Sequence, residues 1–230
     1  THGVSAHGSA PEKGINAVYE MAEIIRRVEA LNQKLHDRKG GGTIVRGSAN
    51  ALFTTAAGSE FILEDITLEG NSISGPPLIA VNNSTKFIMN SGSRIQNCVS
   101  NNTGTVRNMN GTIILNGGEI KNCSGTMGGA FYVSGGSLTI EYATIEGCSA
   151  TNLGGAIFQN GNAKVVIKDG VFSNNKTTSA ASYWSGGGFL CLCTSSLEIY
   201  GGQFINNTSV AHGGCIHHCG CSGTQTDIKG

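Results

Sequence analysis

Six copies of one four-residue phrase recur about 26 residues apart along this chain. Each copy has a large apolar residue, any residue, Gly or Asn, and then Asn or Cys. The copies begin at Leu68, Ile95, Ile120, Ile145, Phe172 and Phe204, so the successive spacings are 27, 25, 25, 27 and 32 residues. A period of this length is typical of a solenoid, in which one coil cannot bury its own apolar face and stacked coils supply the core.

A second apolar position lies five residues before most of these phrases, and short runs alternate apolar with polar residues. Leu138-Thr139-Ile140 and Leu197-Glu198-Ile199 show the alternation expected of strands. Gly, Asn and Ser separate the runs, as tight turns require. The sequence therefore predicts an all-β protein, a right-handed parallel β-helix with three short strands per coil and about 26 residues per coil. We rank an up-and-down β-sandwich below it, because a sandwich would not keep registers at one long period.

Individual positions in the repeat carry further expectations. The residue that opens each phrase should point inward, so Ile145 and Phe172 should be buried. The Asn residues that end a phrase should form a ladder, with neighbouring amides about 4.8 Å apart. In the second coil the preceding apolar residue is Met89, which lies six residues before its phrase rather than five, and this predicts a bulge there.

Composition excludes several classes of protein. The formal net charge is zero and no Lys/Arg run occurs, so the footprint of a nucleic-acid-binding protein is missing. No apolar stretch approaches the roughly 20 residues that span a bilayer, so we expect no membrane span in this segment. The chain starts without Met or a signal peptide and stops at Ile228-Lys229-Gly230, inside a coil, so we expect both ends to be cut.

Residues 1–39 do not share the repeat. Apolar residues there recur at steps of three or four, which predicts an amphipathic helix over residues 15–36: Val18, Met21, Ile25, Val28, Leu31 and Leu35. Residues 40–42 are a triple-glycine joint, and residues 43–230 form the predicted β-helix. We expect the apolar stripe of the helix to cover the open first coil near Ile44, Leu52 and Phe53.

Four glycine pairs open the later coils, and two phrases read Phe-x-x-Asn. The glycine-pair motifs are Gly128-Gly129-Ala130-Phe131, Gly154-Gly155-Ala156-Ile157, Gly187-Gly188-Phe189-Leu190 and Gly213-Gly214-Cys215-Ile216. Together with Phe172 to Asn175 and Phe204 to Asn207, they resemble the passenger repeats of polymorphic outer-membrane proteins, which are autotransporter adhesins. That resemblance covers residues 43–230. It implies a secreted or surface-displayed β-helix that is often an adhesin, placed outside the cell or on its surface.

The run from Gly3 to Val18 is similar to the start of the dimerisation domain of zinc-dependent amidohydrolases of the aminoacylase and desuccinylase type. The matching residues are Ala6-His7-Gly8, Pro11 and Gly14-Ile15-Asn16-Ala17. In that family the histidine that matches His7 reaches into the partner subunit's active site and contacts substrate. The resemblance does not extend to the zinc ligands or to the general base, so we expect His7 to be inactive here and the chain to hydrolyse nothing.

The eight cysteines form two groups. Cys98, Cys123 and Cys148 end three consecutive phrases and should form a vertical file, either of packed thiols or with one disulfide. Aligning the glycine-pair coils places Cys191 beside His217 and Cys193 beside Cys219 on the outer face. These four could remain without a ligand, could include a Cys193–Cys219 disulfide, or could hold zinc. Residues two apart on a strand lie about 6.5–7 Å apart, which is wide for zinc unless the side chains converge.

A binding role and two enzyme-related roles remain open. Tyr183 and Trp184 lie in the longest insertion and could bind a sugar or a protein, or fold back over a coil.

The favoured function is a non-catalytic, structural or adhesive β-helix whose partner is a host surface protein or a glycan, with no cofactor. A polysaccharide-active enzyme is the first alternative; its carboxylates would be Glu119, Glu141, Glu146, Asp169 and Glu198, of which Glu141 and Glu198 flank Val166 about 10 Å apart. The second alternative is a dimerisation fragment of an amidohydrolase, with its oligomeric state unassigned.

Overall fold

The computed structural model describes residues 24–29, 41–179, 185–219 and 225–229 of this 230-residue chain. Residues 24–29 are helical, and Ile24, Ile25 and Val28 there are 45–50% exposed. They belong to a unit, residues 1–40, that is separate from the unit formed by residues 41–230. The rest of the predicted helix lies outside the described residues, and its packing on the first coil stays a prediction.

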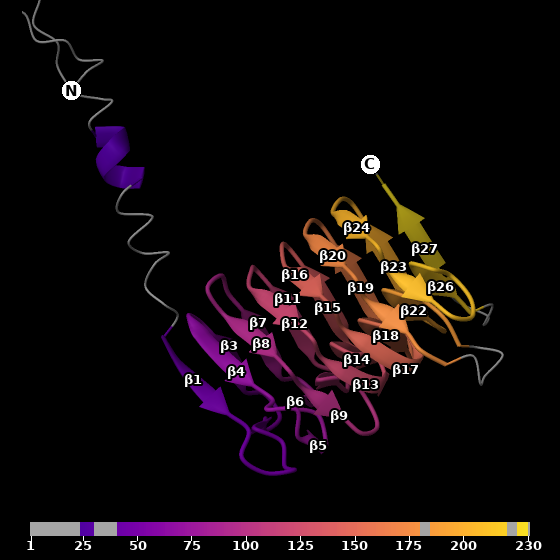
Figure 1. Cartoon of the computed structure of the whole chain (residues 1–230), viewed down its shortest axis with the longest axis horizontal. Coiled ribbons are helices and arrows are strands. Elements are labelled where there is room, and N and C mark those ends of the chain that lie inside the picture. Colours follow the sequence, from indigo (N-terminus) through magenta and orange to yellow (C-terminus); the bar gives the residue numbers. More distant parts are fainter. Residues whose placement is uncertain (1–23, 30–40, 180–184, 220–224, 230) are drawn as a thin grey trace, which may run out of the picture. The chain divides into compact units, whose positions relative to one another are not determined.

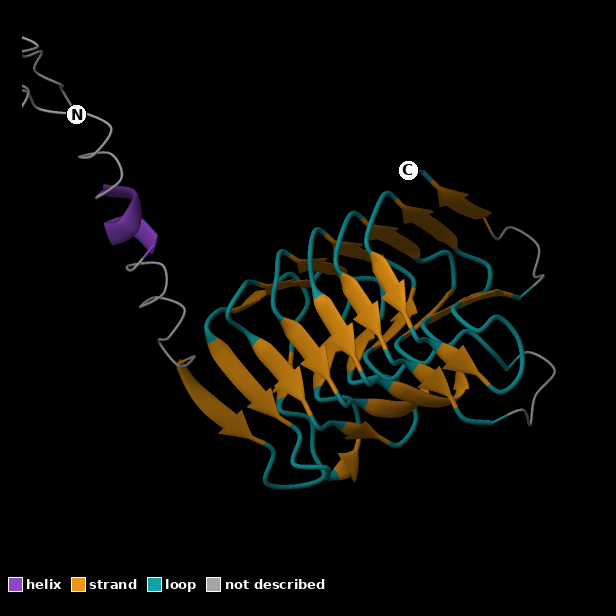
Figure 2. Ribbon diagram, turned by 45° about the horizontal axis from the view of Figure 1, so that its top comes forward, coloured by secondary structure: helices purple, strands orange, loops and turns teal. Residues whose placement is uncertain are grey.

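The described residues from 41 to 229 form a parallel β-helix, as predicted, in which the strands of successive coils stack into sheets (Figures 1 and 2). Each sheet is named here after its first strand. The β1 sheet contains β1 (Gly41–Val45), β4 (Ile66–Glu69), β8 (Arg94–Gln96), β12 (Glu119–Lys121), β16 (Thr144–Glu146), β20 (Val171–Ser173) and β24 (Gln203–Ile205). The β2 sheet contains β2 (Phe53–Thr54), β6 (Ile79–Val81), β10 (Val106–Asn108), β14 (Phe131–Ser134), β18 (Ile157–Asn160), β22 (Leu190–Leu192) and β26 (Ile216–His218).

The β3 sheet contains β3 (Glu60–Leu63), β7 (Lys86–Met89), β11 (Thr112–Leu115), β15 (Ser137–Ile140), β19 (Lys164–Ile167), β23 (Ser196–Ile199) and β27 (Gln225–Ile228). These three sheets correspond to the three strands expected per coil. A fourth, six-stranded β5 sheet adds to them; it contains β5 (Ser74–Gly75), β9 (Val99–Ser100), β13 (Ser124–Met127), β17 (Ser149–Leu153), β21 (Lys176–Thr177) and β25 (Thr208–Ser209). Its strands are mostly two residues long, too short to produce a visible alternation.

The phrase residues behave as expected in the core. Ile145 and Phe172 are fully buried and lie side by side in the β16–β20 register. Met89 is also fully buried, but the predicted bulge is wrong. Met89 pairs in unbroken register with Leu63 on one side and Leu115 on the other. The extra residue lies instead in the turn between β7 and β8, where one more residue fits without disturbing the ladder.

Backbone conformation explains why the third phrase position is Gly or Asn. Asn97, Asn122, Gly147, Asn174 and Asn206 have φ values of 53°, 53°, 64°, 57° and 52°. This left-handed region is open to Gly and is tolerated by Asn, whereas other side chains pay a steric cost there. Every coil from the second onward therefore turns the corner from the β1 sheet to the β5 sheet through one left-handed residue.

From Cys98 onward the fourth phrase position is an interior slot that either Cys or Asn fills, whereas Asn71 of the first copy is exposed. In the last four copies the side chain donates a hydrogen bond to the carbonyl of the first phrase residue in the preceding coil. The pairs are Cys123 Sγ to Ile95 O (4.0 Å), Cys148 Sγ to Ile120 O (3.9 Å), Asn175 Nδ2 to Ile145 O (3.0 Å) and Asn207 Nδ2 to Phe172 O (2.8 Å). Asn175 Nδ2 also donates to Asn207 Oδ1 at 3.0 Å, which confirms the predicted asparagine ladder.

Each glycine pair solves two steric problems at once. Gly154 has a φ of 56°, so it makes the turn into the β2 sheet. Gly155 lies under the next coil, where a Cβ would overlap the carbonyl oxygen of Gly188. The next pair repeats the arrangement, because a Cβ on Gly188 would overlap the carbonyl oxygen of Gly214. The coils thus approach each other backbone to backbone at this corner.

A buried arginine closes the open edge of the β5 sheet. The first coil supplies no strand there, and Arg46, 1% exposed, takes the vacant place beside β5. Its Nη1 donates to Ile73 O (3.2 Å) and its Nη2 to Pro76 O (3.1 Å), the carbonyls that bracket this two-residue strand. A Cβ on Gly75 would overlap Nη2, so glycine is needed for the guanidinium to fit.

Candidate functional site

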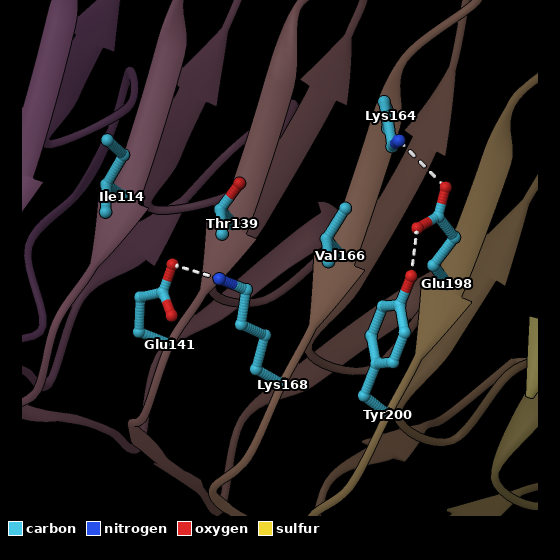
Figure 3. A pocket seen from close by; sticks show the side chains of 8 residues that line it. All are labelled: Ile114, Thr139, Glu141, Lys164, Val166, Lys168, Glu198 and Tyr200. Carbon is cyan, nitrogen blue, oxygen red and sulfur yellow. Dashed lines mark hydrogen bonds and ion pairs between the residues drawn. The ribbon is translucent and has the colours of Figure 1, made fainter. Parts of the chain in front are cut away.

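The outer face of the β3 sheet carries a shallow groove of about 660 Å³. It crosses strands β11, β15, β19 and β23, so four consecutive coils contribute to it (Figure 3). Its lining consists of Ile114, Thr139, Glu141, Lys164, Val166, Lys168, Glu198 and Tyr200.

The floor of the groove is an outward-facing row of neighbours in register. Ile114, Thr139, Val166 and Glu198 pair one to the next across β11, β15, β19 and β23. The same row continues through Ile88 to Ile62, which is 49% exposed. Outward positions of a solvated sheet are usually polar. An aliphatic row along this face is therefore surface that folding alone does not require.

Ion pairs form the two rims. Lys168 Nζ lies 2.8 Å from Glu141 Oε1 on one side of Val166, and Lys164 Nζ lies 2.8 Å from Glu198 Oε1 on the other. Tyr200 donates its hydroxyl to Glu198 Oε2 at 2.9 Å. Figure 3 shows the two pairs on opposite sides of Val166, each lysine pointing toward its own glutamate. The groove thus has an apolar centre, mixed charge at both rims and no net charge.

The electrostatics of the rims do not favour acid catalysis. The hydrogen bond from Lys164, followed by that from Tyr200, lowers the pKa of Glu198. The same contact with Glu198 raises the pKa of Lys164. A glycosidase needs one carboxylic acid whose pKa is raised, so that it holds a proton for the leaving group. The pKa of Glu198 is shifted the other way, and Glu141 is held in its own ion pair.

Sequence reasoning found part of this site. The structure brings the two carboxylates, Glu141 and Glu198, into one groove, but the sequence alignment is two residues out: Glu198 is in register with Val166 and Thr139, and Glu141 lies just beyond β15. Sequence reasoning missed Lys164, Lys168 and Tyr200. Coil alignment places Lys168 beside Glu141, but it places Lys164 beside Ser196, so the contact of Lys164 with Glu198 is diagonal. The other carboxylates proposed for an enzyme lie elsewhere. Glu119 pairs with Arg94 and Glu146 with Lys121 on the β1 sheet, and Asp169 Oδ1 accepts from Gly170 N.

A second cluster lies on the outer face of the β2 sheet. Cys191 and His217 are register neighbours on β22 and β26, and a disulfide joins Cys193 to Cys219, with Cα atoms 5.6 Å apart. The sulfur atoms of Cys191, Cys193 and Cys219 lie within 4.8 Å of one another, so the side chains do converge.

His217 does not complete that group. Its ring nitrogens are not within 4.8 Å of all three sulfurs, and its ring stacks on His212 with centroids 5.4 Å apart. Burial, and then the neighbouring His212 and His218, lower the pKa of His217. The four-residue zinc site considered from the sequence therefore reduces to three sulfurs.

The remaining sequence candidates occupy different environments. Cys98, Cys123 and Cys148 form the expected file and are buried thiols that form no disulfide. Tyr183, Trp184 and His7 lie outside the described residues, so their roles stay predictions. No helix among the described residues has the length and apolar character needed to cross a membrane.

Fold and groove together define a parallel β-helix with a groove on the outer face of the β3 sheet. A family model described as a peptidase dimerisation domain matches residues 1–153, two thirds of the chain, and the chain belongs to that family. The described part of the match beyond residue 40 consists of strands β1 to β17 of the β-helix. No curated protein and no solved structure matches this chain.

Proposed function

We propose that this chain is a non-catalytic, secreted or surface-displayed β-helix with an adhesive role, and that it binds a protein partner through the groove on the β3 sheet. The observation that carries the proposal is the outward row Ile62, Ile88, Ile114, Thr139 and Val166, aliphatic at every position except Thr139, which continues into the groove between two ion-paired rims. Apolar surface left in water costs free energy that a partner recovers by covering it.

The composition of the groove favours a protein over a glycan as the partner. A glycan is recognised mainly by hydrogen-bonding groups and by stacking on aromatic rings. Here Glu141, Glu198, Lys164 and Lys168 already bond one another, and Tyr200 is the single aromatic residue of the lining. A protein surface with an apolar strip flanked by charges of both signs fits the aliphatic floor and the mixed rims.

Two features support a location outside the cell. Disulfides persist in oxidising compartments, and the Cys193–Cys219 disulfide joins two coils of the β-helix. The glycine-pair and Phe-x-x-Asn motifs are similar to the passenger repeats of surface-displayed autotransporters. In this β-helix those motifs make the turns and core contacts of each coil, so they support the architecture more directly than the location.

A single-residue comparison tests the adhesive proposal. Val166→Glu places a charge on the groove floor, whereas Val171→Glu makes the same change on the outward side of β20, in the β1 sheet. Both variants and the parent chain are applied to a panel of immobilised extracellular-matrix proteins and to a glycan array. We expect the parent and Val171→Glu to bind a common set of matrix proteins and Val166→Glu to lose them. Equal binding by both variants, or binding to glycans alone, contradicts the proposal.

Dimerisation is a second candidate function, favoured by the family match over residues 1–153. Ile25 and Val28 in the described helix are each 50% exposed, and such side chains could pack against a second copy. Light scattering after size-exclusion chromatography, over a range of concentrations, measures the mass directly. If the helix carries the dimer, Ile25→Glu with Val28→Glu makes the chain monomeric while Glu29→Lys does not. A dimer that survives both changes depends on another surface, and a monomeric parent chain removes this candidate.

A further inference from the structure

The three sulfur atoms of Cys191, Cys193 and Cys219 are the one group of metal-ligand side chains of this kind in the part of the chain that the structure describes. They come from two adjacent coils of the β2 sheet, at the ends of β22 and β26. We propose that, once the Cys193–Cys219 disulfide is reduced, these three thiolates bind one Zn²⁺ ion.

The distances suit a thiolate site. With Zn–S bonds of about 2.3 Å, tetrahedral geometry places the sulfurs of a zinc site about 3.8 Å apart. Cys191 Sγ already lies within 4.8 Å of both sulfurs of the Cys193–Cys219 disulfide. Once that bond is reduced, side-chain rotations that separate Cys193 Sγ from Cys219 Sγ bring all three sulfurs into range. The sheet register fixes this arrangement, because Cys191 and Cys193 share an outward face and Cys219 lies beside Cys193 on the next strand.

Burial favours a soft, doubly charged ion. Cys191 and Cys219 are almost completely buried, and ionising thiols there without a counter-charge is costly. One Zn²⁺ reduces the total charge of three thiolates from −3 to −1, and sulfur ligands select zinc over harder ions such as Mg²⁺ or Ca²⁺. Cys193 is only partly buried, so the ion and a water molecule as fourth ligand can enter on its side.

The disulfide and the zinc site exclude each other, because both use Cys193 and Cys219. A dithiol reductant supplies two electrons and two protons, which convert the disulfide into two thiols while the reductant becomes a disulfide. Binding of Zn²⁺ to three thiols then forms three Zn–S bonds and releases three protons, as thiolate sites generally do. One position in the fold therefore holds either a covalent link between coils or a metal link between the same coils.

Metal content after controlled reduction tests the proposal. The full chain is prepared oxidised and reduced with a phosphine, incubated with Zn²⁺, desalted and analysed by elemental mass spectrometry. Co²⁺ serves as a spectroscopic probe, since thiolate ligation gives a strong charge-transfer band. We expect about one Zn²⁺ per reduced chain, none per oxidised chain, and that band only after reduction. An oxidised chain that binds Zn²⁺ equally well, or a reduced chain that binds none, overturns the assignment.

Two variants separate this site from the other thiols. Cys191→Ser keeps both disulfide cysteines and removes one ligand, so the zinc affinity of the reduced chain should fall by about 100-fold or more. Cys215→Ser is the control, because Cys215 lies outside the sulfur group. Circular dichroism confirms that each reduced sample keeps its β-structure, and a chain that unfolds on reduction also counts against the site. Unchanged affinity in Cys191→Ser would assign the metal to other residues.

Discussion

The side chain of Asn175 accepts a hydrogen bond through Oδ1 from the backbone N–H of Cys148 in the preceding coil, 2.9 Å away. Its Nδ2 donates to the carbonyl of Ile145 in the same coil as Cys148. One buried amide therefore satisfies both a donor and an acceptor at the corner where the β1 sheet gives way to the β5 sheet. A cysteine in this slot supplies only the donor.

Asn175→Ala should lower the free energy of unfolding by about 2–6 kcal/mol, because it leaves two buried backbone groups without partners at about 1–3 kcal/mol each. Asn175→Cys should lose less, since the preceding coils already use cysteine in this slot. Urea denaturation followed by circular dichroism measures both values. A cysteine variant as unstable as the alanine variant would show that the two residue types are not interchangeable here.

Phe172→Ala should cost about 3–5 kcal/mol, the range for removing a fully buried aromatic side chain. The ring of Phe172 contacts those of Phe189 and Phe204, with centroids 4.8 and 4.9 Å away, so its removal opens a cavity between coils. Val171→Ala is the matched control, because the neighbouring side chain faces outward. Thermal or urea denaturation gives the comparison, and a loss below about 1 kcal/mol for Phe172→Ala would contradict the inward assignment.

Arg46→Met should destabilise the first coils by about 1.5–3 kcal/mol while leaving later coils intact. It removes charge-assisted hydrogen bonds to Ile73 and Pro76, and solenoid coils interact mainly with their neighbours. Hydrogen exchange should therefore show lost amide protection in β4 and β5 but not in β19. Arg94→Met, which removes only an exposed ion pair with Glu119, should change stability by less than about 1 kcal/mol. Uniform loss of protection along the chain would argue against a local cap.

The file of Cys98, Cys123 and Cys148 should resist alkylation in the folded protein. All three side chains are buried, which keeps the reagent away from their sulfurs. The hydrogen bond with Cys123, followed by burial, raises the pKa of both Cys98 and Cys148; against the effect of burial, hydrogen bonds with Cys148 and then Cys98 lower the pKa of Cys123. Mass spectrometry after iodoacetamide treatment should find these three cysteines unmodified in native protein and fully modified in denaturant. Rapid native labelling of any of the three would mean that the coils open more readily than the packing indicates.

The Lys164–Glu198 pair should contribute to stability only above the acidic range. The pKa of Glu198 is lowered from its ordinary 4.5 in the folded state, so its contribution is present above pH 4.5 and is lost as the pH falls through the folded pKa. Lys164→Met should return the pKa of Glu198 toward 4.5, as measured by carbon NMR of the carboxyl group. Added salt should reduce the shift, because the pair is exposed. If Lys164→Met leaves the pKa of Glu198 unchanged, the shift comes from the hydrogen bond that Tyr200 donates to Glu198.

The sequence predicted those parts of the fold in which one residue type recurs at one period. Phe172 and Ile145 were recognisable because the same position is apolar in every coil. The β5 sheet was not recognisable, since strands as short as Lys176–Thr177 show no alternation of apolar and polar residues. Arg46 gave no signal at all, because a buried arginine beside an edge strand occurs once and so has no period.

The groove was predicted in part for a similar reason. Coil alignment located Glu141 and Glu198 on the same sheet, but whether their carboxylates are free depends on Lys164 and Lys168, whose side chains reach across one coil spacing. The sequence alone does not determine how far such a side chain extends. The convergence of Cys191 on the Cys193–Cys219 pair was missed because strand spacing describes Cα atoms, whereas the sulfurs lean toward one another.

The contact of Gly155 with Gly188 also constrains how the gene can change. From Gly129 through Gly155 and Gly188 to Gly214, each glycine-pair coil places a glycine against a glycine of its successor, so a duplicated coil of this kind brings its own fitting surfaces with it. An insertion between the two glycines of one pair would instead force a side chain against the next backbone, whereas the longer segment between β21 and Gly187 leaves the contact of Gly155 with Gly188 intact. Descendants of this gene should therefore differ in length by whole repeats, gained or lost through recombination between similar coils, and small insertions should be confined to segments between strands, such as those after β7 and β21.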